Sequence, residues 1–143
     1  MNVGGILDEK GRNVETADPE ATLQDIATVL GTRKIGALII LNSSGKIAGI
    51  LSERDIVRAI AQDGPAALSK PATDFMTEKV VTCSESDTVN HLMESMTQGR
   101  FRHLPVVERG KLSGIISIGD VVKHRIAEAE FEAEEMKRYI ASV

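Results

Sequence analysis

Two serine–aspartate pairs are the residues whose types and spacing could do chemistry. Ser52 and Asp55 lie in the stretch GILSERDIV, and Ser117 and Asp120 lie in the similar stretch GIISIGDVV. Each serine is placed to open a helix, where unpaired N–H groups and a partial positive charge suit a phosphate. An ionised carboxylate one turn into the helix suits the two hydroxyls of a ribose instead. The hydroxyl and carboxylate together therefore favour a nucleotide or nucleoside over a bare anion.

The same spacing also fits a purely structural role. In a capping box, the serine hydroxyl accepts from the N–H of the third helical residue and the acid reaches back to the serine N–H. The usual acid there is Glu or Gln, whereas both copies carry Asp. Both serines also follow a glycine, Gly49 or Gly114, by three residues. A cap and a ligand site are compatible, so the motif alone leaves both interpretations open.

The paired motif belongs to a tandem duplication. The two halves keep the same register over most of their length. The aligned pairs before the motif are Val14 and Val80, Thr16 and Thr82, Thr22 and Thr88, and Leu38 and Leu104. A single-residue length change follows, where NSSGK in the first half faces ERGK in the second. Turn segments tolerate such changes best. Because the register is otherwise kept, we interpret the two halves as copies of one unit.

Each copy is predicted to have the order β-α-β-β-α. Apolar residues at i, i+3, i+4 and i+7 predict amphipathic helices over 23–30 and 89–96, with Thr22 and Thr88 as N-caps. Two short apolar runs joined by a glycine-containing turn then predict a hairpin, and each Ser-x-x-Asp opens a second helix. Brief extended segments, 14–16 and 80–82, lead into each copy.

The predicted fold class is α/β, in the mixed α+β sense, with two such repeats packed against each other. We assign residues 1–67 to the first repeat with its lead-in, 68–126 to the linker and second repeat, and 127–143 to a helical extension. The linker is the stretch QDGPAALSKPATDFM. One long helix is predicted from about 120 to 143, serving either as a solvated cap or as a docking helix for a partner or second copy.

Composition excludes several classes of function. The net charge is −4, with acids and bases interspersed, and a nucleic-acid-binding protein would normally show a concentrated basic face. No apolar run approaches the roughly 18–20 residues of a membrane helix, and no signal peptide is recognised. A single cysteine, Cys83, precludes an internal disulfide and fits a reducing compartment. We therefore expect a cytoplasmic protein with no nucleic-acid or membrane partner.

Motifs for catalysis are missing. The sequence has no GxxxxGK[ST] or GxGxxG loop, and neither serine lies in G-x-S-x-G. His91, His103, His124 and Cys83 lack metal-ligand spacing. We expect no enzyme activity and no metal beyond one that accompanies ATP.

The doubled G-h-h-[ST]-x-x-D ending, the element order and RFRHLPVV before the second hairpin resemble cystathionine β-synthase (CBS) domains. A tandem pair of these domains is called a Bateman module, and the resemblance covers about residues 1–126. It implies repeats packed through their sheets in a pseudo-twofold pair, with two clefts for adenosine-containing ligands. These ligands are AMP, ADP, ATP, NAD(H) or S-adenosylmethionine. It also implies a homodimer formed through the CBS faces.

The resemblance assigns roles to particular residues. Asp55 and Asp120 would hold ribose hydroxyls, with Ser52 and Ser117 near ribose or phosphate. The remaining residues implied to line the base or its ribose are Thr16 and Thr82, with the backbone of Gly36, Ala37 and Leu38 and of His103, Leu104 and Pro105 around the adenine.

Phosphate contacts are implied for the two positions before LPV, here Arg102 and His103. The first repeat departs from this pattern, because its equivalents are Gly36 and Ala37. Arg54 and Lys34 are the local candidates to replace them. The second repeat has Gly119 where Arg54 stands, so the basic groups of the two repeats are complementary.

The function expected from the sequence is a regulatory, energy- or redox-sensing module that binds an adenine nucleotide between its repeats. An effector protein in trans would receive the signal. The alternative is a ligand-free dimerisation or protein-interaction module in which Ser-x-x-Asp is only a helix cap. A response of the melting temperature to nucleotides would discriminate between them.

Overall fold

The computed structural model describes residues 1–142; Val143, the last residue of the predicted tail helix, lies outside the described residues. The helices are α1 Val3–Lys10, α2 Leu23–Arg33, α3 Glu53–Asp63, α4 Val89–Gly99 and α5 Ile118–Ser142, with the short 3₁₀ helices η1 Gly64–Ser69 and η2 Ala72–Asp74. The strands are β1 Thr16–Ala17, β2 Ala37–Leu41, β3 Ile47–Ser52, β4 His103–Glu108 and β5 Lys111–Ser117. This mixed α+β architecture confirms the predicted fold class.

The first repeat is a three-stranded sheet covered by α2 and α3. β1 runs parallel to β2, and β2 and β3 form the predicted antiparallel hairpin. Leu38 and Ile40 on β2 pack with Leu23, Ile26 and the rest of one apolar cluster. The second repeat has the β4–β5 hairpin, α4 and the start of α5 around a separate cluster. Its sheet has two strands, because the predicted lead-in strand at 80–82 does not form and only Cys83 makes a single parallel bridge to Val106.

Helix caps at equivalent threonines confirm the predicted helix starts. The Thr22 hydroxyl accepts from the N–H of Asp25, and the Thr88 hydroxyl accepts from the N–H of His91. Such caps satisfy N–H groups that the first turn of a helix cannot pair internally.

The segments that lead into the repeats are exchanged between them. α1, which the sequence did not predict, precedes the first repeat but buries Val3, Ile6 and Leu7 in the core of the second. The linker before the second repeat forms η1 and η2 and buries Ala67 and Ala72 in the core of the first. Each core is therefore completed by chain from the other half.

The repeated glycines explain how these segments fit. A Cβ on Gly49 of β3 would lie 2.7 Å from Met76 Sδ and 2.8 Å from the Thr77 carbonyl oxygen. A Cβ on Gly114 of β5 would lie 2.8 Å from a methyl carbon of Leu7. Both glycines let an exchanged segment cross close to a strand.

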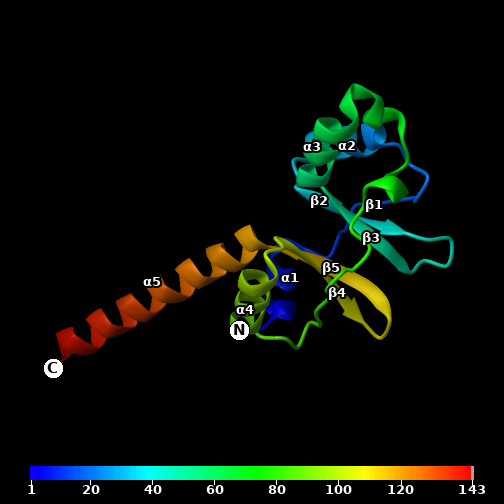
Figure 1. Ribbon diagram of the computed structural model, residues 1–143. Helices are drawn as coiled ribbons and strands as arrows, with labels where there is room; N and C mark the ends of the chain where they lie inside the picture. The colour runs from blue at the N-terminus through cyan, green and yellow to red at the C-terminus, as the bar shows by residue number, and fades with distance from the viewer. Residues whose placement is uncertain (143) are drawn as a thin grey trace.

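The two repeats meet through their sheets, at the centre of the molecule (Figure 1). Ile39 points to the opposite side of β2 from Leu38 and Ile40, yet it is fully buried. The side of β2 that is turned away from the helices is therefore covered at Ile39.

α5 begins at the end of β5 and extends far from both repeats (Figure 1). Its start agrees closely with the predicted tail helix. Of its residues only Val121 is fully buried, so most of this helix lies in solvent. No helix within residues 1–142 is both long enough and apolar enough to cross a membrane.

Candidate functional site

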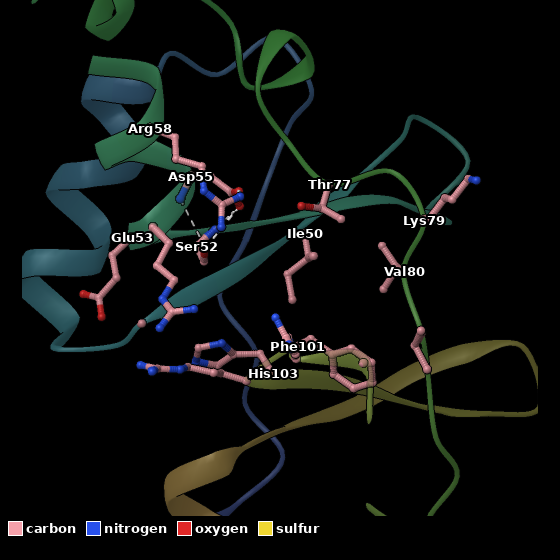
Figure 2. A pocket seen from close by; sticks show the side chains of 16 residues that line it. Ile50, Ser52, Glu53, Asp55, Arg58, Thr77, Lys79, Val80, Phe101 and His103 are labelled. Atoms are coloured by element: carbon pink, nitrogen blue, oxygen red, sulfur yellow. Dashed lines mark hydrogen bonds and ion pairs between the residues drawn. The ribbon is translucent and has the colours of Figure 1, made fainter. Parts of the chain in front are cut away.

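A pocket of about 460 Å³ lies between the two repeats, beside the first Ser-x-x-Asp motif. It is built from the junction of β3 and α3, the segment 77–81 after the linker, and the segment 99–103 before and at the start of β4. Figure 2 shows Ser52 and Asp55 on one side of this pocket and Phe101 and His103 on the other. We call it the Asp55 pocket. Its volume is in the range of small-molecule sites.

Asp55 is a buried carboxylate, only 8% exposed, at the edge of this pocket. Its Oδ2 accepts from the backbone N–H of Ser52 at 2.9 Å and from the Ser52 hydroxyl at 3.1 Å. The Ser52 Oγ in turn accepts from the N–H of Asp55, which completes a capping box. Oδ1 has one charged neighbour, the exposed Arg58, at 3.7 Å. One carboxylate oxygen thus serves the cap, and the other faces no strong partner.

The N–H groups that open α3 are largely used within the protein. The N–H of Glu53 donates to the carbonyl oxygen of Gly36 at 3.0 Å, and the N–H of Asp55 donates to Ser52. Two of the first three N–H groups are therefore unavailable to an anion. The helix start expected from the sequence to seat a phosphate offers little for one, so any phosphate contact must come from side chains.

Basic side chains supply that capacity. The pocket is lined by five of them, Arg54, Arg58, Lys79, Arg100 and Arg102, against two acids, Glu53 and Asp55. Apart from the contact of Arg58 with Asp55, none of the five makes an ion pair within residues 1–142. This excess of three positive charges favours an anionic ligand.

Apolar side chains form the remaining walls. Ile50, Val80, Val81 and Phe101 line the pocket, and Val81 is 49% exposed although valine is usually buried. Figure 2 shows Ile50 and Val80 on the same side of the pocket as Thr77, facing Phe101. A flat, partly apolar group such as a heteroaromatic base suits these walls.

His103 begins β4 and packs against Gly36 of the first repeat. A Cβ at Gly36 would lie 3.1 Å from His103 Nε2, so glycine is the residue that permits this approach. Burial lowers the pKa of His103 below its ordinary value, and Lys10 and Arg102 lower it further against the opposing carboxylates. The imidazole is therefore neutral near pH 7 and can act there as a hydrogen-bonding group.

The second Ser-x-x-Asp motif has the same cap but different surroundings. The N–H of Ser117 donates to Asp120 Oδ2 at 2.9 Å, and the N–H of Asp120 donates to Ser117 Oγ at 3.1 Å. Lys10 Nζ reaches from α1 to the same Oδ2 at 2.7 Å and to the carbonyl oxygen of Ile115 at 2.8 Å. The adjoining pocket measures only about 150 Å³. The repeated motif therefore has two unequal environments.

Lys10 lowers the pKa of Asp120. Burial raises the pKa of Asp120, but the hydrogen bonds from Lys10 and Ser117 outweigh it, and the pKa lies below its ordinary value. The carboxylate is charged and paired at neutral pH.

The structure brings some of the predicted site residues together and not others. Those that line the Asp55 pocket are Gly36, Ser52, Arg54, Asp55, Arg102 and His103. Asp120 lines the small second pocket, beside Ser117. Those outside both pockets are the exposed Thr16, Lys34 and Thr82 and the buried Ala37, Leu38, Leu104 and Pro105.

Sequence reasoning missed several lining residues: Arg58, Thr77, Lys79, Val80, Val81, Arg100 and Phe101. One signal could have found part of this set. Thr77 bridges to Ile50 of the first repeat, so the linker carries residues 77–81 across to the other half. The resemblance implied Thr82 of this segment as a lining residue, whereas the pocket is lined by Lys79, Val80 and Val81 just before it.

Comparisons with known proteins agree with this architecture. The family model for the CBS domain matches residues 7–62 and again 72–127, so the chain belongs to the CBS domain family and carries two copies. A CBS domain-containing protein of Arabidopsis thaliana, CBSX3, mitochondrial, is 30% identical over 146 residues, covering 96% of this chain and 71% of that protein. The crystal structure of the CBS-domain containing protein ATU1752 from Agrobacterium tumefaciens is 48% identical, with a TM-score of 0.85 over 87% of this chain and 92% of the other.

Two further neighbours were solved with ligands. The CBS domain protein PAE2072 from Pyrobaculum aerophilum, complexed with AMP, is 28% identical with a TM-score of 0.75 over 84% of this chain and 89% of the other. The CBS domain pair of protein MJ0100, in complex with 5′-methylthioadenosine and S-adenosyl-L-methionine, is 26% identical with a TM-score of 0.80 over 90% of this chain and 98% of the other. Both of these neighbours thus bind adenosine-containing ligands.

Proposed function

We propose that this CBS pair is a regulatory module that binds one phosphate-bearing adenine nucleotide per chain, in the Asp55 pocket. The observation that carries the proposal is the Asp55 carboxylate, buried at the edge of a cavity of about 460 Å³, with one oxygen engaged by the cap and the other aimed at no strong partner. The capping interpretation and the ligand interpretation of Ser-x-x-Asp are then both correct, each using one oxygen.

The proposed binding mode divides the nucleotide among three surfaces. Asp55 Oδ1 accepts hydrogen bonds from the ribose hydroxyls. The base lies against the apolar walls near Val80, Val81 and Phe101. Complexes of related pairs with AMP and with 5′-methylthioadenosine support an adenosine moiety as the shared part of the ligand.

The most distinctive feature of this pocket is its set of arginines, which would bind the phosphate of the nucleotide. Arg54 comes from the first repeat and Arg102 from the second, and both lack an ion-pair partner within residues 1–142. Guanidinium groups bind phosphate oxygens in bidentate geometry, so one phosphate chain can engage both repeats at once. The positive lining favours AMP, ADP, ATP or NAD(H) over S-adenosylmethionine, which carries a cationic sulfonium.

Regulation follows from the position of the pocket. A ligand that contacts both repeats shifts their relative arrangement only to the extent that it binds one arrangement more tightly than another. Because Arg54 and Arg102 belong to different repeats, the proposed phosphate contact supplies such a difference. We propose that an effector protein, or a second copy bound through the CBS faces, responds to that change.

A thermal-shift panel tests the proposal. AMP, ADP, ATP, NAD⁺, NADH, S-adenosylmethionine and adenosine are added to the wild type and to Arg54→Ala, Arg102→Ala and Lys34→Ala variants. Saturable stabilisation is expected from phosphorylated ligands. Arg54→Ala and Arg102→Ala should reduce it more for these ligands than for adenosine. Lys34→Ala is the matched control, because Lys34 is an exposed cation outside the pocket.

Two results would contradict the proposal. A flat response to every ligand, from protein with a cooperative melting transition, would favour the ligand-free interaction module. An equal loss for adenosine and for phosphorylated ligands would remove the phosphate role of the two arginines.

A further inference from the structure

Along α5, apolar residues recur at alternating spacings of four and three. The series is Val122, Ile126, Ala129, Ala133, Met136 and Ile140. This is the a/d repeat of a coiled coil, with Ile126, Ala133 and Ile140 at a positions and the others at d positions. All six residues are exposed in the chain by itself. We propose that α5, from Val122 to Ile140, pairs with the same helix of a second copy as a parallel two-stranded coiled coil.

This apolar seam faces away from the body of its own chain. Among the α5 side chains that lie against the rest of the chain, Val121 is fully buried, and His124 and Glu128 continue the same row along the helix. With 100° between successive residues, the centre of this row lies about 125° around the helix from the centre of the a/d seam. The seam can therefore meet a partner helix without displacing any contact of the monomer, and α5 projects clear of both repeats (Figure 1).

Two large exposed apolar residues of α5, Tyr139 and Phe131, lie outside the seam, and Phe131 is the one on the side opposite to it. It follows His124 by seven residues and so continues the body-facing row beyond the point where the body ends. Its side chain is 66% exposed, like that of Ile140. Phe131 therefore serves as a matched control for effects of exposed apolar surface alone.

Charged residues beside the seam favour pairing with a second copy of the chain in parallel orientation. In a parallel coil, each g residue faces the e residue of the next heptad on the other helix. Arg125 at g then faces Glu130 of the second copy, and Glu132 at g faces Lys137 of the second copy. Both pairs attract, and each occurs twice by symmetry.

An antiparallel pairing of the same seam is disfavoured by the same charges. Overlap of all six apolar positions would place Glu130 against Glu130, Glu132 against Glu132 and Lys123 against Lys137. Each of these contacts repels. The existing ion pairs of Arg125 with Glu128 and of Lys137 with Glu134 lie on the exposed surface of one helix, where such pairs contribute little and can be exchanged.

Engineered cysteines test the proposal on the full chain. Ala129→Cys places a thiol at a d position, and Glu134→Cys places one on the outer side of the same helix. Wild type is the blank, because its Cys83 is buried. In a parallel coil, equivalent d residues meet across the axis at distances a disulfide can span. In a glutathione redox buffer, Ala129→Cys is expected to give several-fold more disulfide-linked dimer than Glu134→Cys.

Exchanging charges beside the seam tests whether the disulfide-linked fraction depends on specific pairing. Random collisions between chains would not respond to the position of these charges. Glu132→Lys in the Ala129→Cys background should lower the linked fraction, and the added change Lys137→Glu should restore it. Phe131→Ala should leave the fraction unchanged. Circular dichroism verifies that α5 stays helical in each variant.

Three outcomes would overturn the proposal. They are equal linking of Ala129→Cys and Glu134→Cys, a disulfide that forms only between Ala129→Cys and Ala133→Cys chains, and no rescue by the double charge exchange. The second outcome would mean that the two helices pair antiparallel. The first would mean that α5 does not pair with a second copy through this seam. Because no nucleotide is added, failure here leaves the proposed function of the Asp55 pocket untouched.

Discussion

Lys10 Nζ lies 2.7 Å from Asp120 Oδ2, and this ion pair distinguishes the two halves of the protein. In the alignment of the repeats, the position of Lys10 corresponds to Met76, whose side chain packs on Gly49 and not on Asp55. Lys10 therefore forms an ion pair with the carboxylate of the second motif. The carboxylate of the first motif, Asp55, has no lysine partner within residues 1–142 and lines the larger pocket. This difference between the exchanged segments contributes to the asymmetry of the duplicated site.

The Lys10–Asp120 pair is expected to stabilise the fold. Both side chains are partly buried, and Lys10 also donates to the carbonyl of Ile115. A double-mutant cycle with Lys10→Met and Asp120→Asn should give a coupling free energy of about 1 kcal/mol in urea unfolding. Coupling indistinguishable from zero would mean that the pair forms without stabilising the chain.

The same pair predicts a pH dependence. Because the folded-state pKa of Asp120 is depressed, its contribution is present above the ordinary aspartate pKa and is lost as pH falls through the folded value. Wild type should therefore lose more stability than Lys10→Met on acidification below about pH 4. Parallel acid-unfolding curves for the two proteins would contradict this assignment.

Substitution of two glycines by alanine should change the stability of the fold in opposite directions. Gly49→Ala places a methyl group within 3 Å of Met76 and of the Thr77 backbone, so we expect about 1–3 kcal/mol of destabilisation. Gly31, in the last turn of α2, has nothing within 4 Å of an added Cβ. Gly31→Ala should stabilise by up to about 1 kcal/mol through helix propensity. Thermal unfolding of both variants measures the contrast, and destabilisation by both would sink the packing argument.

His103 should titrate below the ordinary range of histidine. Burial lowers its pKa, so protonation favours the unfolded chain and His103 removes stability as pH falls below about 6.5. NMR titration of the imidazole resonance, assigned with a His103→Asn variant, measures the midpoint directly. A midpoint at or above 6.5 would show that the neighbouring carboxylates outweigh burial.

Cys83 should be inert in the folded protein. Burial raises the pKa of its thiol to about 12, and neighbouring Asp87 and Glu108 act in the same direction. A thiol reagent at pH 8 should label the native chain far more slowly than the chain in urea. Rapid labelling of the native chain would indicate that this part of the second core opens readily.

Much of the fold could be predicted from the sequence because its signals are local. Periodic apolar residues and the caps Thr22 and Thr88 fix helices, and the glycine-containing turns fix hairpins. α1 gave no such signal, because Gly4 and Gly5 lower the helix propensity of its first turns. Its stability comes from burying Val3, Ile6 and Leu7 in a distant part of the chain, which a local pattern cannot reveal.

The candidate site was predictable to a similar extent. Its repeated residues, such as Asp55, were visible because the sequence states them twice. The walls from residues 77–81 and 99–101 were not, because they come together only through the crossing of the linker at Ile50. The closure of the second motif by Lys10 depends on the same exchange of segments.

The central claim is a single nucleotide site built on Asp55, and calorimetric titration of AMP tests it most directly. Asp55→Asn and Asp120→Asn are compared with wild type, because asparagine keeps an oxygen that can still cap the helix. We predict one AMP per chain, binding lost in Asp55→Asn, and binding retained in Asp120→Asn. Two sites per chain, or binding that survives Asp55→Asn and disappears in Asp120→Asn, would contradict the account.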